Sequence, residues 1–211
     1  MLGQKFHGSR NEKMIALTFD LCPSHINGGY DSVIIRTLVD SGVPATFFLS
    51  GKWIKNHKRN FQELTNIPIF EFANHSFSHP HFTSLSDDSI RKEIVKTEHL
   101  FKHIKSSSRF FRPPYGEINR RVDSIVQSLG LTSVLYDVIS GDPDSTFSKE
   151  RLFRSVKSQT QNGSIIVMHA NGKGWRTAET LPQIIQSLRE KGYKFVQVSE
   201  LFKTPQVTKR I

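Results

Sequence analysis

Short apolar segments alternate with stretches of helical periodicity along most of this chain of 211 residues. The seven apolar segments are residues 14–19, 45–49, 67–72, 109–111, 132–136, 164–168 and 194–198. Strands that alternate with helices form parallel sheets, because the chain must cross over between neighbouring strands. Seven such units in a single domain favour a closed or nearly closed α/β barrel, and an open doubly wound sheet is the alternative.

Apolar positions three and four residues apart predict the helices between these strands. One predicted helix has Ser86 as its N-cap and acidic residues in its first turn, where they complement the helix dipole. The stretch 52–64 is also predicted to be helical, from a weaker pattern. Glycines that close helices in the left-handed conformation stand just past three other predicted helices, at Gly42, Gly130 and Gly192.

Side chains capable of chemistry end or follow five of the predicted strands. They are Asp20, His75, His79, Arg112, Asp137, Asp142 and His169. Parallel barrels build their active sites at the C-terminal ends of the strands and in the loops that follow. The sequence therefore predicts an enzyme site at one end of the barrel.

His75 and His79 are spaced so that both imidazoles can meet one cation. A strand precedes them and Pro80 follows, so the pair differs from the helical histidine pair of zinc proteases, which also has a glutamate after its first histidine. Two histidines and a carboxylate form a divalent-metal site with positions left for water and substrate. Such an ion acidifies water and polarises a carbonyl group.

The remaining polar residues supply what a hydrolase of amides or esters needs. Asp20 can accept a proton from water, and Arg112 can keep that carboxylate ionised and oriented. His169 can protonate a leaving amine, with Asp142 fixing its tautomer. The turn at residues 112–116, Arg-Pro-Pro-Tyr-Gly, can aim a backbone N–H at an oxyanion. Each also has a structural alternative, such as a helix cap for Asp20 or a core position for His169.

Five segments resemble the five motifs of the NodB-type polysaccharide deacetylases, carbohydrate esterase family 4. They are Thr-Phe-Asp at 18–20, Asn-His-Ser-Phe-Ser-His at 74–79, Arg-Pro-Pro-Tyr-Gly at 112–116, the segment 137–142 and Val-Met-His at 167–169. The resemblance implies a distorted (β/α)7 barrel, a divalent metal (zinc, with cobalt or nickel as alternatives) and removal of N-acetyl groups from sugars. Peptidoglycan, chitin-like glycans and exopolysaccharides are the substrates it suggests.

The resemblance also implies a role for each matching residue. His75 and His79 are expected as metal ligands, and Val167 stands at the acetyl pocket, where the family usually has leucine. The expected catalytic residues are the base Asp20, its partner Arg112, Tyr115 through its backbone N–H, and the acid His169 with Asp142.

The chain departs from the family at the residue that follows the base. The family usually has a second, metal-binding aspartate there, whereas this chain has Leu21, which cannot ligate, and then Cys22. The hypothesis is that Asp31 supplies the missing carboxylate, with His25 or Asp20 itself as alternatives. Cys22 is expected to be a small buried apolar residue; the alternative, a nucleophile paired with His169, is disfavoured.

Composition bears on partners and compartment. Lys and Arg outnumber Asp and Glu by 29 to 19, and the net charge of +10 suits an anionic glycan. The basic residues are scattered, so no nucleic-acid partner is expected. A lone cysteine excludes an intramolecular disulfide. The polar start is not typical of a signal peptide or membrane anchor, so we expect either a cytoplasmic protein or one that lost its leader on the way to the cell envelope or outside.

The predicted organisation is an N-terminal extension at residues 1–13, a catalytic domain at 14–202 and a polar tail at 203–211. The leading function is metal-dependent N-deacetylation of a glycan. The alternatives are a relative that hydrolyses small amides or imides, a non-catalytic carbohydrate-binding protein on the same scaffold and, on charge alone, a nucleic-acid-binding module. The family's catalytic residues, retained together, argue against a purely binding role.

Overall fold

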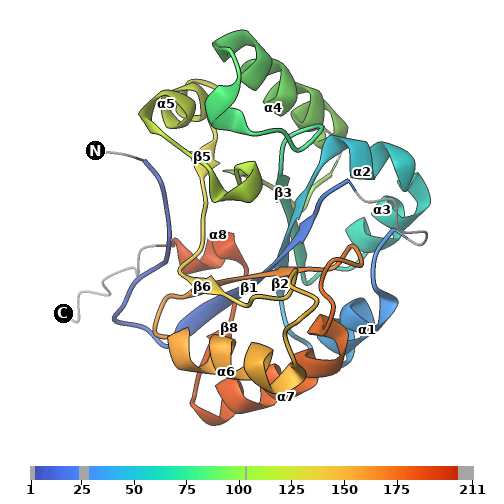
Figure 1. Cartoon of the computed structure of the whole chain (residues 1–211), viewed down its shortest axis with the longest axis vertical. Helices are drawn as coiled ribbons and strands as arrows, with labels where there is room; N and C mark the ends of the chain where they lie inside the picture. The colour runs from blue at the N-terminus through green and yellow to red at the C-terminus, as the bar shows by residue number, and fades with distance from the viewer. Residues whose placement is uncertain (1–2, 24–28, 103, 204–211) are drawn as a thin grey trace, which may run out of the picture.

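The computed structural model of the protein describes residues 3–23, 29–102 and 104–203. Its centre is a curled, parallel sheet that forms a half-barrel with helices around the outside (Figure 1). The strands run in the order β5-β4-β3-β2-β1-β7-β6, and β8 pairs with the start of β1. They are β1 (Met14–Leu21), β2 (Ala45–Leu49), β3 (Phe70–Asn74), β4 (Ser107–Phe111), β5 (Thr132–Ser133), β6 (Val138–Ile139), β7 (Ile165–His169) and β8 (Lys194–Phe195).

Eight α-helices lie between or after these strands within the described residues. They are α1 (Ser32–Asp40), α2 (Gly51–Asn56), α3 (Lys58–Thr65), α4 (Asp87–Phe101), α5 (Arg120–Ser128), α6 (Lys149–Gln159), α7 (Thr177–Glu190) and α8 (Val198–Leu201). Ser86 caps α4 by accepting the Ser89 N–H, and Gly130 and Gly192 take positive φ after α5 and α7, as predicted. No helix in the described part of the chain is long and apolar enough to cross a membrane.

Three local predictions differ from the structure. The predicted helix 52–64 is broken at His57, whose φ of −129° and ψ of 48° are not helical. The predicted strand 132–136 ends at Ser133, and the two-residue strand β6, which is too short for a periodic signal, was not predicted. The predicted strand 194–198 is β8 followed at once by α8, because the chain turns after two ladder residues.

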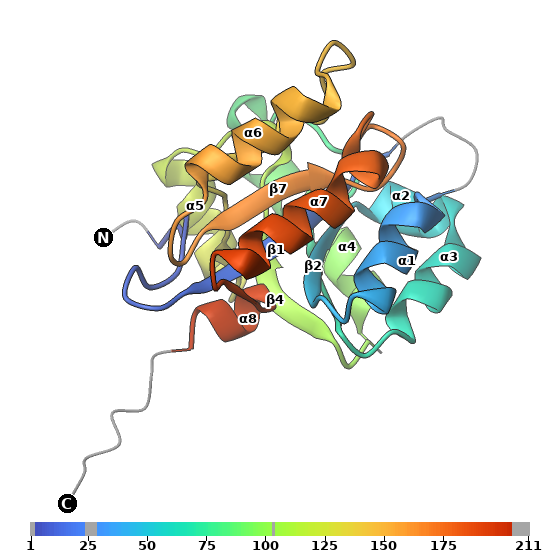
Figure 2. The same ribbon diagram turned by 90° about the horizontal axis from the view of Figure 1, so that it is seen from below.

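The two faces of the strands have different roles. Along β1, Leu17, Phe19 and Leu21 pack under the helices, in the larger apolar core. The alternate residues, Thr18 and Asp20, face the inside of the half-barrel, because successive side chains of a strand point to opposite faces. Figure 2 shows α6 and α7 lying side by side over β7 and β1. The outer face of the sheet is therefore an apolar core, and the inner face is free to carry polar groups.

The segment before β1 ties the two sides of the sheet together. Lys5 forms a parallel bridge with Val134, just past β5, and His7 forms an antiparallel bridge with Ser164, just before β7. The Arg10 guanidinium binds the Asp137 carboxylate at 2.8 Å. Part of the predicted extension 1–13 thus contacts the barrel.

Candidate active site

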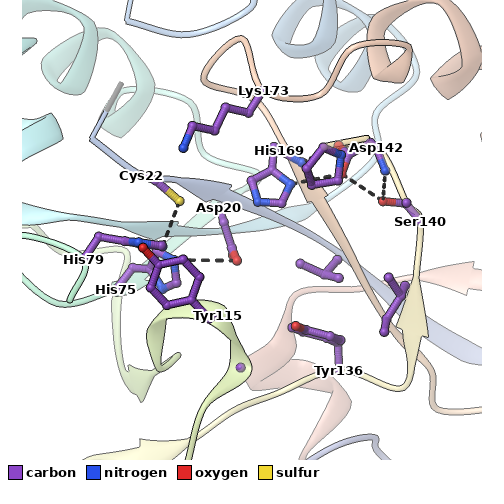
Figure 3. Close-up of a pocket in the computed structure, with 15 residues that line it drawn as sticks. Asp20, Cys22, His75, His79, Tyr115, Tyr136, Ser140, Asp142, His169 and Lys173 are labelled. Atoms are coloured by element: carbon purple, nitrogen blue, oxygen red, sulfur yellow. Dashed lines mark hydrogen bonds and ion pairs between the residues drawn. The ribbon is translucent and has the colours of Figure 1, made fainter. Parts of the chain in front are cut away.

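The C-terminal ends of the parallel strands surround a pocket of about 280 Å³ (Figure 3). Its lining brings together residues that lie up to 153 positions apart in the sequence, from Asp20 to Lys173. The lining residues are Asp20, Cys22, His75, His79, Tyr115, Gly116, Tyr136, Ile139, Ser140, Gly141, Asp142, Pro143, Val167, His169 and Lys173. The predicted site residues outside this lining are Arg112, which lies behind the pocket, Asp31 and Asp137. Asp137 was expected at the C-terminal ends of the strands but lies at the start of β7, where it binds Arg10 and accepts the Ile165 N–H.

Arg112 holds Asp20 from beneath the pocket. Its fully buried guanidinium donates to Asp20 Oδ1 at 2.7 Å and to Thr18 Oγ1 at 2.8 Å, and it stacks on the Phe48 ring at 3.8 Å. Burial alone would raise the pKa of Asp20, but the charges of Arg112, His75 and His169 lower it below its ordinary value. Asp20 is therefore an ionised carboxylate with Oδ1 engaged and Oδ2 turned toward His75, 3.7 Å away.

His75 is set up as a ligand. Its Nδ1 lies 2.8 Å from the Arg112 carbonyl oxygen, so Nδ1 carries a proton and Nε2 is the nitrogen that can bind an ion. The residue is 1% exposed, and among the described residues Nε2 is the one buried polar side-chain atom without a hydrogen-bond partner. A buried, unpaired nitrogen is costly unless something binds it. This observation favours a metal ion at Nε2.

The loop that carries both histidines is held in an unusual backbone conformation. Ser76 and His79 have φ of 64°, and with Tyr115 at 59° they are the three non-glycine residues with positive φ in the described ranges. Glu93, on α4, accepts hydrogen bonds from the Phe77 and Ser78 N–H groups and from Ser78 Oγ. All three left-handed residues thus lie in site loops, where such strain commonly marks function.

Cys22 lies among three imidazoles. Its sulfur is 3.2 Å from His79 Nε2. Burial alone would raise the pKa of this thiol, but the imidazoles of His169, His75 and His79 lower it well below its ordinary value. Cys22 is buried as predicted, with 3% exposure. Its sulfur, however, contacts a polar group, the His79 imidazole, rather than only apolar side chains.

These atoms fit a metal ion. The ligand atoms of Cys22, His75 and His79 lie within 4.8 Å of one another, and they form the one group of at least three such residues found in the described chain. The structure does not bring Asp31 to this group. Asp31 instead caps α1, where its Oδ1 accepts the Val33 N–H at 2.9 Å. His25, an alternative ligand, lies outside the described residues.

His169 and Asp142 form a second pair on the opposite side of Asp20 (Figure 3). Asp142 Oδ1 lies 3.0 Å from His169 Nδ1, while Oδ2 accepts the His169 backbone N–H and the Thr177 hydroxyl, each at 2.7 Å. Burial alone would lower the pKa of His169, but Asp142, Cys22 and Asp20 raise it to about 10. His169 is therefore protonated at neutral pH, with Nδ1 toward Asp142.

The rim of the pocket is aromatic on one side and cationic on the other. Tyr115, 56% exposed, stacks on His81 with ring centroids 4.2 Å apart and meets His79 edge to face at 4.6 Å. Lys173 extends above Cys22 and His169 in Figure 3. Trp175, also 56% exposed, follows in the same loop. An aromatic ring, Tyr115, and a cation, Lys173, therefore border the opening of the pocket.

Several site residues were not predicted. Tyr136 lines the pocket, and burial and the Asp20 charge raise its pKa. Ser140 and Thr177 orient Asp142, and Thr18 supports Arg112. Period-two alternation from Asp20 was a signal for Thr18. Thr177 carried no such signal, because it lies 35 residues from Asp142 in the sequence and meets it only in the folded protein.

The fold and the site together define a distorted (β/α)7-barrel protein with a histidine pair that can hold a metal. The family follows from comparison with known proteins: the family model described as polysaccharide deacetylase matches residues 7–134. The chain belongs to this family, the NodB-type deacetylases of carbohydrate esterase family 4, as the five motifs indicated.

Individual relatives include enzymes and a pseudoenzyme. A bifunctional xylanase/deacetylase of Pseudobutyrivibrio xylanivorans is 33% identical over 92% of this chain, which spans 31% of that protein. A solved peptidoglycan N-acetylglucosamine deacetylase superposes with a TM-score of 0.87, at 27% identity, over 96% of this chain and 94% of that one. The structure of a CE4 family pseudoenzyme from Bacillus anthracis superposes with a TM-score of 0.85, at 29% identity, over 96% of this chain and 70% of that one.

Proposed function

We propose that this chain is a divalent-metal-dependent hydrolase that removes N-acetyl groups from an N-acetylated glycan. The observation that carries the proposal is the order of groups across one pocket. A buried carboxylate, held by an arginine, lies between a histidine pair and a protonated histidine backed by an aspartate. Within the chain, residues 14–202 are proposed as the catalytic domain.

Each group has a distinct task in the proposed reaction. Asp20 accepts a proton from water through its free Oδ2, because Arg112 occupies Oδ1. The Tyr115 backbone N–H stabilises the oxyanion. His169 then donates its proton to the leaving amine, while Asp142 keeps the imidazolium oriented. His75 and His79 hold the metal, which when bound acidifies water and polarises the acetyl carbonyl.

The substrate class rests on the relatives and on charge. Relatives are named as deacetylases of peptidoglycan N-acetylglucosamine, of peptidoglycan N-acetylmuramic acid and of xylan. The net charge of +10 and the position of Lys173 beside the pocket favour an anionic polymer among these. A peptidoglycan or an acidic exopolysaccharide is the proposed substrate.

A second candidate is a carbohydrate-binding protein without activity. It is favoured by the similar fold of a pseudoenzyme, of which a mutant with restored enzymatic activity has also been solved. Leu21, which stands in place of the family's usual metal-binding aspartate, also favours a protein without activity. Against it stands Arg112, which is fully buried and holds Asp20 at 2.7 Å, an arrangement that glycan binding does not need.

Acetate release from N-acetylated glycans tests the proposal. The protein, loaded with zinc or cobalt, is expected to release acetate from peptidoglycan fragments. Asp20→Asn removes the base with little change in shape, and we expect kcat to fall by roughly 10²–10⁴-fold. Asp31→Asn, in the cap of α1, is the matched control and should retain activity. Glycan binding without acetate release under every metal tested would favour the second candidate, and turnover of cyclic imides alone would indicate the small-amide alternative.

A further inference from the structure

The path of the chain after Asp20 brings Cys22 back to the pocket. β1 continues through Leu21, which pairs with Leu49 of β2 and is fully buried in the apolar core under the helices. Because side chains alternate along a strand, the residue after Leu21 returns to the face that carries Asp20. The position that would hold a second carboxylate in the family is thus turned into the core here, and the thiol one residue later faces the histidines.

The sulfur stands where a third ligand would complete the histidine pair. It lies 3.2 Å from His79 Nε2, and together with His75 Nε2 the three atoms lie within 4.8 Å of one another. The unpartnered Nε2 of His75 is a second observation that points to a ligand at this place. Two imidazoles and one thiolate match the preferences of zinc, and three protein ligands leave an open position for chemistry.

The two carboxylates that compete for this role are engaged elsewhere. Asp31 accepts the N–H groups of Val33 and Ile34 as the cap of α1. Asp20 is bound through Oδ1 to Arg112. A thiolate ligand leaves Asp20 Oδ2 available for proton transfer, whereas ligation by Asp20 would remove the base that the proposed reaction needs.

We infer that Cys22 is the third protein ligand of the metal, so that this chain binds its ion through one thiolate and two imidazoles. The inference rests on the proposed function, which supplies the metal. It also specifies the metal further, because a soft thiolate favours zinc or cobalt over magnesium, calcium or manganese.

Cobalt spectroscopy tests this ligand set without any substrate. Co²⁺ is added to the metal-free protein, and a sulfur-to-cobalt charge-transfer band in the near ultraviolet is expected with about one ion per chain. Cys22→Ser should lose that band and weaken metal binding by at least about 100-fold, since even outer partners of ligands contribute 10–100-fold. Asp31→Ala should keep the charge-transfer band and the metal affinity of the wild type, although it removes the cap of α1. Circular dichroism checks that both variants are folded.

The results separate this inference from the proposed function. Cobalt binding with no charge-transfer band, or a Cys22→Ser variant that binds cobalt as tightly as the wild type, would overturn the thiolate ligand even if acetate is released. Loss of metal in Asp31→Ala but not in Cys22→Ser would overturn it in favour of the carboxylate. A charge-transfer band that depends on Cys22 supports the ligand even if no glycan is deacetylated, and only the proposed function would then fail.

Discussion

At the scale of single residues, Asp142 is fixed in place by an extensive set of hydrogen bonds. Its two oxygens accept four hydrogen bonds: from the backbone N–H and Nδ1 of His169, from Ser140 Oγ and from Thr177 Oγ1. The residue is 1% exposed, so no solvent competes for these bonds. Asp142 therefore fixes the orientation of the His169 ring and raises the pKa of His169.

Replacing Asp142 by Asn should therefore disable the proposed acid. An amide has one oxygen and one NH₂ group, and the latter cannot accept the bonds that Oδ1 or Oδ2 now takes. We expect kcat for acetate release to fall by about 10²–10⁴-fold with KM changed little. Thr177→Val, which removes one donor from Oδ2, should reduce kcat much less. A kcat within about threefold of wild type for Asp142→Asn would contradict the proposed role of Asp142 in supporting His169.

At the scale of elements, the loop between β7 and α7 closes the site from one side. The backbone at Gly174 passes so close to Asp142 that a Cβ atom there would lie 2.8 Å from Asp142 Oδ2 and 2.5 Å from Thr177 Oγ1, and it would also meet the His169 carbonyl oxygen. The Trp175 N–H donates to the Asp142 backbone carbonyl at 3.1 Å. Glycine at position 174 is required by this close approach.

Gly174→Ala is accordingly expected to displace the loop from Asp142. We predict a fall in kcat of at least about tenfold, because shifts of about 1 Å in catalytic groups are costly. Gly42→Ala, at a left-handed position where nothing lies within 4 Å of the added methyl, controls for general loss of stability. Its unfolding free energy should fall by about 1–2 kcal/mol without a change in kcat. Equal kcat in both variants would contradict this view of the loop.

A second element-scale feature is the buried carboxyl of Glu71, which joins β3 to α8. Glu71 Oε2 accepts the Thr46 hydroxyl at 2.7 Å and the Ser199 N–H at 3.3 Å, and the residue is 4% exposed. Burial raises the pKa of Glu71 above its ordinary value of 4.5, although the hydrogen bonds from Ser199 and Thr46 oppose the shift. The folded protein therefore binds a proton here more tightly than the unfolded chain does.

The raised pKa of Glu71 predicts the direction of a pH dependence. Its stabilising contribution is fully present below the unfolded pKa and is lost as the pH rises through the folded pKa. The unfolding free energy of Glu71→Gln minus that of wild type should thus increase as the pH rises above the ordinary value of 4.5 and through the raised folded pKa. Urea titrations of both proteins measure it, with Glu190→Gln on the exposed end of α7 as the control for lost surface charge. A difference that stays constant with pH would refute the prediction.

At the scale of the whole molecule, the net charge of +10 should affect how fast and how tightly an anionic substrate binds. Opposite charges on protein and polymer raise the rate of encounter and the affinity, and salt screens both. We expect KM for an anionic N-acetylated glycan to rise with salt while kcat stays constant, and KM for a neutral N-acetylated oligosaccharide to change little. Lys173→Ala should reduce the salt dependence. Equal salt effects on the two substrates would argue against an anionic polymer.

Much of the fold could be predicted because its signals are local. The alternation of apolar runs and helical stripes depends on neighbours within about a turn. Of the eight strands in the described ranges, seven overlap predicted runs. The two-residue strand β6 was missed because it is too short for a periodic signal and is defined by its pairing with β7. The break at His57 interrupts a stretch whose helical pattern was weak. Residues at strand ends, such as Asp20 and His169, were found because parallel strands bring all their C-terminal ends to one edge.

By itself, the sequence determined the parallel α/β architecture, the family motifs and the set of polar groups at one edge of the sheet. Only the tertiary structure decided which of these groups meet. It placed Asp31 on a helix cap, it turned Leu21 into the core, and it brought the Cys22 sulfur within 3.2 Å of His79 Nε2, 57 residues away in the chain. The physical reason is that such contacts depend on how far a strand extends and how loops return to it, which local periodicity does not encode.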